Sequence, residues 1–527
     1  MDAIGRLSSV LSALFSSSKG QTEDAPPKKA IAIVGAGTGG IGALKALLDL
    51  PEEVREGWKI DVLEQTAHVG GMWVPEPNPP PPPDLPNTPL YPALRTNTPH
   101  PTMTYPNFPF PPSTPLYPSH SALKEYHEDY VVYHSLIPYI RFKHAVLSAT
   151  YSAASRWTLT IRDSSNNTVA TFDRRYDHLI VAKGNNHYPN IPIWPGQDEW
   201  LHSGSSGTRQ ILHSLWYREP DVYKDHVVVV IGDGASGRDM AAQTLPFAKE
   251  VYHSYDAKTL RPIVLPPVPG VTLKPRISHF TRTSIVFTDG TVLETPDDAK
   301  TTVLLGTGFD TVVPWLPQLT VSPNVDSSTT SLATNRRYIR PLFRHVLSLD
   351  PSIPSEALAF VGLPLWISNA PSDYAQGLLV AHAIADPSWL GSREELMHDL
   401  NKQEDALRLQ GINPYRYGHA FATEIESEAY LNGLIDLLRS RSPTKLPAFL
   451  SDPATPYMAP WRRHAREQTF FMRRGWLRAQ AMGVERQFYE GARAEAEWVE
   501  RMRMLEEWTR EMEEREGRIK GVVEEPL

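Results

Sequence analysis

The residues best suited to chemistry are glycines in short turns whose spacing fits the binding of a dinucleotide. In the first turn, Gly35, Gly37 and Gly40 follow the pattern GxGxxG. Such glycines allow a sharp bend, close approach of the backbone to a pyrophosphate, and tight packing of a helix on a strand. Glu64 ends the next predicted strand, where a carboxylate can accept hydrogen bonds from ribose hydroxyls. The first turn is therefore predicted to bind a dinucleotide.

The same spacing occurs a second time along the chain. Gly232, Gly234 and Gly237 repeat the pattern, with Ser236 beside the last glycine. The helix that follows such a turn offers backbone N–H groups to phosphates. Two complete turns imply two bound dinucleotides, and the alternative is a second fold that keeps its glycines only for packing.

Composition and charge restrict the other kinds of chemistry. The 527 residues include no cysteine, which excludes disulfides, thiolate metal sites and a nucleophilic thiol, and no metal site is predicted. Any redox chemistry must therefore belong to a bound cofactor. The net charge is -8 without a long basic block, so no nucleic-acid partner is expected. No apolar run approaches the roughly 18 to 20 residues of a membrane span, so a soluble, cytoplasmic protein is expected.

The elements around the glycine turns predict an α/β fold. The apolar run 30–34 precedes the first turn and the run 227–231 precedes the second, and each turn leads into a helical pattern. Strand, tight turn and helix in this order are the start of a Rossmann-type domain. The sequence therefore predicts two Rossmann-type dinucleotide-binding domains and, after them, a helical C-terminal extension.

The domain organisation follows from where these patterns begin and end. The region 74–118 is so rich in proline that helix and central strand are both excluded, and it is predicted to be a long loop. The predicted order is an N-terminal linker, a first nucleotide domain that contains this loop, a second nucleotide domain, a return to the first domain, and the helical extension, over 1–28, 29–200, 201–330, 331–395 and 396–527.

Both ends of the chain carry apolar residues at helical spacing. In the first 18 residues they predict either a weak targeting or membrane-surface helix or an ordinary frayed terminus. In the extension, Trp498, Met502, Leu505 and Met512 form a stripe that favours docking of a terminal helix over a partner-binding site. An apolar stripe serves a core and a homodimer interface equally well, so the oligomeric state stays open.

Several linked motifs over 29–385 resemble those of the flavin-containing monooxygenases, a family of class B flavoprotein monooxygenases. GAGTGG with Glu64 is similar to the family's FAD turn, and GDGASGRD is similar to its NADPH turn. The segments between and after these turns also match: GGMW with Gly71 and Trp73, YPALRTN with Thr96 and Asn97, the FPFP stretch, HSLWYREP with His213, LGTGF, and Gln376.

The resemblance implies an FAD domain into which an NAD(P)H domain is inserted. NADPH reduces FAD, oxygen forms a flavin hydroperoxide, and one oxygen atom passes to the nitrogen or sulfur of a small organic substrate. The protein contributes binding and exclusion of water, and the cofactors supply the redox chemistry. Small-molecule substrate and O2 are the implied partners, and Gly71, Trp73, Thr96 and Gln376 join the glycine turns as cofactor-binding residues.

Two residues receive catalytic assignments from the resemblance. Asn97 is placed beside the reactive flavin, where an amide can donate and accept hydrogen bonds without carrying charge. The alternative is an asparagine that caps the turn before Thr98 and Pro99. His213 lies between the two folds and is expected to be a structural or gating histidine rather than a general base, because no orienting carboxylate is evident.

The chain departs from the family pattern at two informative positions. Lys183 stands where a threonine is usual, so the contact made there does not carry over. Asp256 stands where an arginine usually binds the 2′-phosphate of NADPH, and an aspartate there repels phosphate but can accept hydrogen bonds from NADH. Lys258 or Arg261 are candidates to replace the arginine. A weakened preference for NADPH is expected, and NADH remains an alternative electron donor.

Three other functions remain open from the sequence. A Baeyer–Villiger monooxygenase would convert a ketone to an ester, although Tyr217 and Arg218 differ from what that family usually shows after the histidine. A flavin oxidase or NAD(P)H reductase would release peroxide without oxygenating a substrate. A non-enzymatic nucleotide-binding protein would use the helical extension as its interaction surface.

Overall fold

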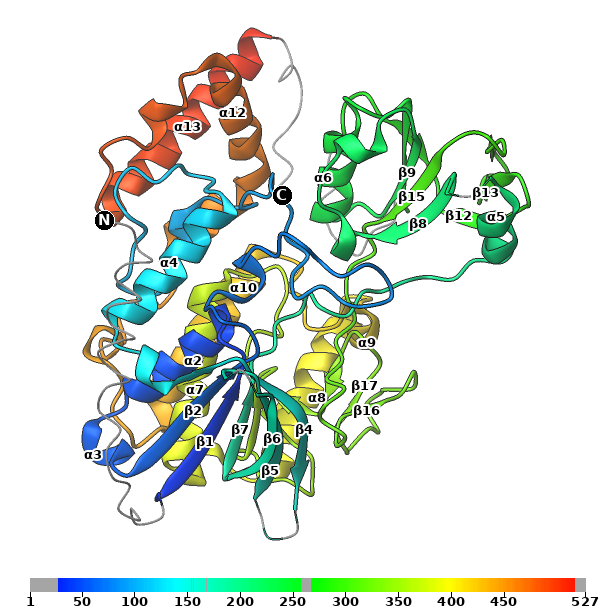
Figure 1. The fold of residues 1–527 in the computed structure, drawn as a ribbon. Helices are drawn as coiled ribbons and strands as arrows, with labels where there is room; N and C mark the ends of the chain where they lie inside the picture. Colours follow the sequence, from blue (N-terminus) through cyan, green and yellow to red (C-terminus); the bar gives the residue numbers. More distant parts are fainter. Residues whose placement is uncertain are drawn as a thin grey trace.

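The structure is a computed structural model of the whole chain, and it describes residues 27–516 except 153, 155, 167, 206 and 257–266. The N-terminal apolar segment lies outside the described residues, as do Lys258 and Arg261. Figure 1 shows three groups of elements: a large sheet with its helices, a smaller sheet set to one side, and a group of C-terminal helices.

The large sheet has seven strands, and its central strands carry the first glycine turn. The buried run β1 (Lys29–Val34) pairs in parallel with β2 (Trp58–Glu64) on one side and with β7 (His178–Val181) on the other. The remaining strands are β3 (Ile140–Phe142), β19 (Leu342–Phe343), β20 (Leu347–Ser348) and β21 (Leu358–Phe360), in the order β19-β20-β21-β7-β1-β2-β3. The predicted strand, turn and helix around Gly35 are thus confirmed.

Two helices pack closely on this sheet. Helix α2 (Thr38–Leu48) follows the first turn, and α7 (Asn369–Ala385) lies against it from more than 300 residues later. A Cβ on Gly377 of α7 would lie 2.8 Å from the Cα of Ala43 in α2, so the two helix backbones touch at a residue without a side chain. Small residues at the crossing therefore set how near the late helix comes to the first turn.

The smaller sheet carries the second glycine turn and is parallel throughout. Its strands are β8 (Arg209–His213), β9 (Val227–Ile231), β10 (Glu250–Ser254), β11 (Thr272–Lys274) and β15 (Thr301–Leu305), in the order β11-β10-β9-β15-β8. Helix α6 (Ala235–Thr244) follows the turn, and α5 (Gln197–Ser203) flanks the sheet. The chain enters this sheet after β7 and returns to the large sheet at β19, so the α/β fold with two Rossmann-type units is confirmed.

Small antiparallel sheets complete these two units. They consist of β4 (His144–Tyr151), β5 (Trp157–Asp163) and β6 (Ala170–Tyr176); of β12 (Ile277–Phe280), β13 (Ser284–Phe287) and β14 (Val292–Glu294); and, with one parallel pair, of β16 (Thr320–Val321), β17 (Ala333–Thr334) and β18 (Ile339–Arg340). Each of these sheets has three strands and is separate from the two larger sheets.

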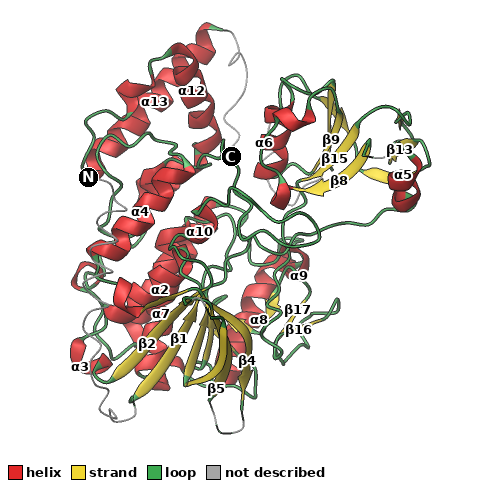
Figure 2. Ribbon diagram, in the orientation of Figure 1, coloured by secondary structure: helices red, strands yellow, loops and turns green. Residues whose placement is uncertain are grey.

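The C-terminal region is helical, as expected (Figure 2). Its helices are α8 (Arg393–Leu409), α9 (Pro414–Tyr417), α10 (Glu424–Arg441), α11 (Pro460–Glu467), α12 (Thr469–Met482) and α13 (Glu495–Arg515), and two helices earlier in the chain are α3 (Glu52–Arg55) and α4 (His120–Tyr133). Trp498, Met502 and Leu505 of the predicted stripe are buried in one cluster with residues of α12. The stripe thus docks the terminal helix within the chain.

The proline-rich region contains neither an α-helix nor a strand, and its regular structure is the 3-10 helix His100–Met103 together with isolated β-bridges such as that between Tyr105 and Phe108. In the part of the chain that the structure describes, no helix is both long and apolar enough to span a membrane. Those residues also contain no group of three or more histidines and carboxylates that could hold a metal ion.

Candidate functional site: two nucleotide turns joined by a proline-rich loop

The first turn has the tight geometry that a pyrophosphate-binding loop needs. Gly35 has a φ of +105°, a conformation that L side chains rarely adopt. A Cβ on Gly40 would lie 1.8 Å from the carbonyl oxygen of Gly35, so helix α2 starts directly against the turn. Gly37 is the N-cap of α2, and no side chain caps this helix end. Its free N–H groups are therefore available to a phosphate.

Glu64 lies beside this turn at the end of β2, as expected. Its carboxylate is buried and accepts hydrogen bonds from the N–H groups of Ala36 and Thr66, each at 2.8 Å. An ionised carboxylate has about four acceptor positions, so two remain for another donor. The residue is thus oriented by the backbone in the place where a ribose diol would need it.

The GGMW segment packs directly on the first turn. The N–H of Gly70 donates to the carbonyl of Ala36 at 3.0 Å, and a Cβ on Gly71 would lie 3.0 Å from the Cα of Gly37. The two glycine backbones therefore face each other, and Trp73 closes the short 3-10 turn Gly71–Trp73 at this point. This arrangement fits the pyrophosphate part of a bound FAD.

Gln376 is held in place by hydrogen bonds within the protein, which the sequence did not indicate. It is fully buried on α7, its Oε1 accepts from the N–H of Gly362 at 3.0 Å, and its Nε2 donates to Ser372 Oγ at 2.6 Å. One amide hydrogen and one acceptor position remain free. Its flavin contact stays a prediction, while its contact with the Gly362 loop is directly visible.

Thr96 and Asn97 lie side by side but in different surroundings. Thr96 is 2% exposed, and its N–H donates to the carbonyl of Pro118 at 3.1 Å. Asn97 is exposed, and within the described residues its side chain makes no hydrogen bond to the following backbone. A capping asparagine would make such a bond. The geometry therefore supports an amide that is available to a ligand over the alternative of a turn cap.

The second turn repeats the geometry of the first and leaves more room. Gly232 has a φ of +98°, and a Cβ on Gly237 would lie 1.9 Å from the carbonyl oxygen of Gly232. At Gly234 a Cβ would meet no atom within 4 Å. Ser236 stands in the first turn of α6, next to this open space. The donors and the space fit the pyrophosphate of NADPH.

His213 ends β8 and both of its ring nitrogens are used by the protein. Nδ1 accepts from the N–H of Leu215 at 3.1 Å, so Nε2 carries the proton and donates to the carbonyl of Gly308 at 2.9 Å. Burial lowers the pKa of His213 to about 4. The histidine is therefore neutral and fastens the LGTGF turn after β15, which favours the structural role over that of a general base.

The end of β10 holds a charge pair that the sequence did not reveal. Asp256 lies 3.7 Å from Arg276 Nη1, because β11 adds to the sheet in parallel beside β10 and brings the following residues to the same end. Asp256 stands where the family usually has an arginine. Arg276, which follows the neighbouring strand β11, places a guanidinium beside that position. No short motif marks Arg276, since its placement depends on strand order.

Lys183 follows β7 and lies next to the first turn. Its Nζ donates to the carbonyl of Gly184 at 2.9 Å and lies 5.6 Å from the ring centre of Tyr188. Burial lowers the pKa of Lys183 to about 8. The loop after β7 thus carries a lysine with a lowered pKa where the family usually has a threonine.

The proline-rich loop connects the two nucleotide units, which no motif in the sequence indicated. On the FAD side, Thr88 Oγ1 donates to the carbonyl of Met72 at 2.6 Å. On the other side, Arg218 Nη2 donates to the carbonyl of Thr88 at 2.9 Å, and the hydroxyl of Tyr91 hydrogen-bonds to Asp239 of α6. The loop that carries Asn97 is therefore anchored to both turns.

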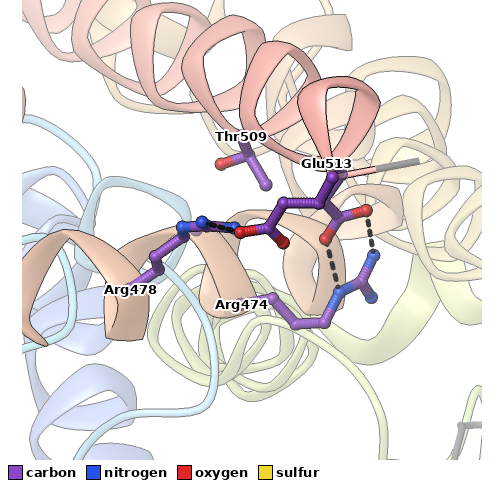
Figure 3. Close-up of a pocket in the computed structure, with 6 residues that line it drawn as sticks. Arg474, Arg478, Thr509 and Glu513 are labelled. Atoms are coloured by element: carbon purple, nitrogen blue, oxygen red, sulfur yellow. Dashed lines mark hydrogen bonds and ion pairs between the residues drawn. The ribbon is translucent and has the colours of Figure 1, made fainter. Parts of the chain in front are cut away.

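Two pockets lie in or beside the helical extension, away from the two glycine turns. One of about 240 Å³ between α12 and α13 is lined by ion pairs, including Arg474 Nε to Glu513 at 3.0 Å (Figure 3). The other, of about 320 Å³, lies between the FPFP stretch and α11 and includes the edge of Trp498. Neither contains a residue predicted to bind a cofactor.

Comparison with known proteins matches this arrangement. The family model "Flavin-binding monooxygenase-like" matches residues 28–260. From Arabidopsis thaliana, flavin-containing monooxygenase FMO GS-OX-like 7 is 30% identical over 430 residues, covering 77% of this chain and 83% of its own length. FMO GS-OX-like 2 from the same plant is 28% identical over 439 residues, covering 78% and 85%.

Among solved structures, S-allyl-L-cysteine S-oxygenase from Allium sativum superposes with a TM-score of 0.68 at 23% identity, covering 91% of this chain and 98% of that one. The shared fold, the two nucleotide turns and the sequence identity over most of the chain all indicate the same family. This chain belongs to the flavin-containing monooxygenase family and is an oxidoreductase that uses FAD and NADPH.

Proposed function

We propose that this enzyme transfers one oxygen atom of O2 to the sulfur or nitrogen of a small organic substrate. The observation that carries the proposal is the proline-rich loop, which is anchored to both nucleotide units through Thr88 and Tyr91 and presents the exposed side chain of Asn97 shortly after these anchors. The names of the relatives support sulfur as the first atom to test, since one of them is an S-oxygenase of a thioether amino acid.

When bound, NADPH and FAD would supply the redox chemistry, that is, hydride transfer and activation of O2. The chain's residues bind and orient them. Glu64 would accept hydrogen bonds from the ribose of FAD, and the facing backbones of Gly37 and Gly71 would receive its pyrophosphate. The space at Gly234 would hold the pyrophosphate of NADPH. Thr96 and Trp73 would flank the flavin, and Gln376, which binds the N–H of Gly362, would hold that loop beside it.

Asn97 is the group proposed to touch the reacting atoms. Its amide can hold a developing negative charge through its N–H2 group and accept a hydrogen bond through its oxygen, and it stays neutral at any working pH. His213 acts at a distance, since it fixes the LGTGF turn between the two units through Gly308. The loop is anchored to both nucleotide units and would help to keep water from the site.

The test is oxygen incorporation from ¹⁸O2 into three probes of different chemistry: a thioether amino acid, N,N-dimethylaniline and cyclohexanone. Enzyme loaded with FAD is supplied with NADPH, and products are identified by mass spectrometry. The expected result is a sulfoxide or an N-oxide that contains one ¹⁸O atom. An ¹⁸O-labelled lactone as the main product would instead assign a Baeyer–Villiger reaction, and peroxide without any oxygenated probe would assign an oxidase.

A further inference from the structure

The last two helices of the extension pack on the loop that carries Asn97. Leu116 and Tyr117 of the loop are buried in the same apolar cluster as Met472 and Trp476 of α12. The hydroxyl of Tyr117 donates to the carbonyl of Thr469 at 3.3 Å. The loop segment that returns from Asn97 is therefore part of the core of the extension.

A second set of contacts links the same two parts of the chain. Arg462 Nη1 of α11 donates to the carbonyl of Pro101 at 2.8 Å, and the N–H of Ser113 donates to the carbonyl of Ala492 at 3.4 Å. These contacts lie on both sides of the segment 102–112. The loop is thus held by the extension at several points, and not by Tyr117 alone.

Arg473 of α12 reaches the peptide bond next to Asn97. Its Nη1 donates to the carbonyl of Thr96, and its guanidinium lies 5.4 Å from the ring centre of Tyr117. The N–H of Thr96 is held by the carbonyl of Pro118. A peptide group is planar, so the atoms from the Cα of Thr96 to the Cα of Asn97 move together. Fixing the Thr96 carbonyl therefore fixes the position of the Asn97 Cα and the orientation of the peptide plane from which its side chain is set, so that only rotation about the bonds of Asn97 itself remains.

We propose that the C-terminal extension is part of the catalytic unit and that Arg473 is a positioning residue, which holds Asn97 in its working orientation through the Thr96 carbonyl. This inference rests on the proposed function of Asn97. Arg473 contacts neither cofactor turn, and it reaches Asn97 only through the backbone of Thr96. This positioning role also gives a reason why the extension packs on the loop that carries Asn97.

The neighbouring residue offers a matched control. Arg474 is on the same helix, but it points to α13 and pairs with Glu513 at 3.0 Å, within the extension (Figure 3). Arg474→Gln removes one cation from α12 and leaves the Thr96 carbonyl satisfied. Arg473→Gln removes the same charge and the contact with Thr96, so the difference between the two variants reports on the Asn97 loop.

The experiment uses the full chain with FAD and compares Arg473→Gln, Arg473→Lys and Arg474→Gln with the unmodified enzyme. Two quantities are measured: oxygenated product formed per NADPH consumed, and amide hydrogen exchange of the peptide that covers 94–104. For Arg473→Gln we expect a fall in product yield of about tenfold and exchange about tenfold faster, because small displacements of a catalytic group cost this much or more. Arg473→Lys keeps one donor and should recover part of both.

FAD content and the Kd of NADPH should stay unchanged in all three variants, and Arg474→Gln should match the unmodified enzyme in both quantities. If Arg473→Gln behaves like Arg474→Gln, the positioning role is wrong. Faster exchange of Arg473→Gln with unchanged product yield also refutes the positioning role, provided that Asn97→Ala does lower the yield. If Asn97→Ala leaves the yield unchanged as well, the proposed role of Asn97 is wrong instead. Arg473→Lys keeps the comparison usable if Arg473→Gln does not fold.

Discussion

At the residue scale, Asn97 is defined by the contrast between its exposed side chain and the preceding residue, Thr96, whose backbone N–H and carbonyl are both hydrogen-bonded. Replacement by alanine removes the only uncharged amide that the loop offers at this point, while the cofactor turns are left intact. We expect Asn97→Ala to retain FAD and to lose oxygenated product per NADPH by about tenfold or more, with peroxide released instead. FAD absorbance, product and peroxide are measured on the same sample.

A suitable control for this change is Asn87→Ala in the same loop. Asn87 binds the Glu76 carboxylate at an exposed position and contacts no nucleotide turn. It should leave the product yield unchanged. An Asn97→Ala enzyme with the yield of the control would show that the amide has no catalytic role.

The charge pair at the end of β10 determines the second prediction at this scale. Arg276 is the described cation next to Asp256, and a 2′-phosphate would compete with the aspartate for it. We expect Arg276→Gln to weaken the binding of 2′,5′-ADP by about tenfold and to leave that of 5′-AMP unchanged, because only the first ligand carries the 2′-phosphate. Titration calorimetry measures both affinities.

Asp256→Asn should act in the opposite direction and strengthen binding of 2′,5′-ADP, because it removes the repulsion that the sequence indicated. Arg282→Gln, an exposed change on the same domain, serves as the control. Equal effects of Arg276→Gln on the two ligands would contradict phosphate recognition by this residue.

At the scale of elements, two helical glycines separate packing from helix propensity. A Cβ on Gly475 of α12 would lie 1.7 Å from Thr509 Oγ1 of α13, whereas a Cβ on Gly433 of α10 would meet nothing within 4 Å. Gly475→Ala should therefore lower the free energy of unfolding by about 1–3 kcal/mol. Gly433→Ala should raise it by about 0.5–1 kcal/mol, since alanine favours the helix.

Urea denaturation of the two variants measures both changes. Because the substitution is the same, helix propensity cancels in the comparison and the remaining difference reports on the contact between α12 and α13. A Gly475→Ala protein as stable as Gly433→Ala would mean that the two helices do not pack as closely as described.

At the scale of the whole molecule, buried neutral histidines determine the dependence of stability on pH. Burial lowers the pKa of His100 to about 3, and those of His127, His213 and His382 to about 4. These histidines stay neutral in the folded state but bind a proton in the unfolded state below about pH 6.5. Stability is therefore fully present above that pH and falls as the pH drops toward the folded values.

At pH 5 each such histidine should cost about 2 kcal/mol of stability relative to pH 7. Asp373 acts in the opposite direction, because burial raises its pKa to about 8. The histidines outnumber it, so the thermal midpoint should fall clearly between pH 7 and pH 5, where most carboxylates remain ionised. Calorimetry at several pH values measures this, and His382→Asn should make the slope shallower. A midpoint that does not change over this range would contradict the prediction.

How much of the fold was predictable depends on how local the signal is. The strands that lead into Gly35 and Gly232 were predicted from short apolar runs, since a buried parallel strand is apolar on both faces. The apolar run 303–309 is only partly strand, because β15 covers Thr301–Leu305 and the rest of that run is the LGTGF turn. An apolar run shows that a strand is buried but does not mark its ends.

The sequence by itself determined the parts of the site whose requirement is local. A turn such as that at Gly35 needs residues without a side chain wherever the chain folds this way, and Glu64 follows at the end of the next strand because parallel strands are adjacent. The tertiary structure decided the rest. Arg473 meets Thr96 across 377 positions, and Arg276 meets Asp256 through strand order. Such pairs depend on how helices pack and in which order strands join, which no short segment encodes.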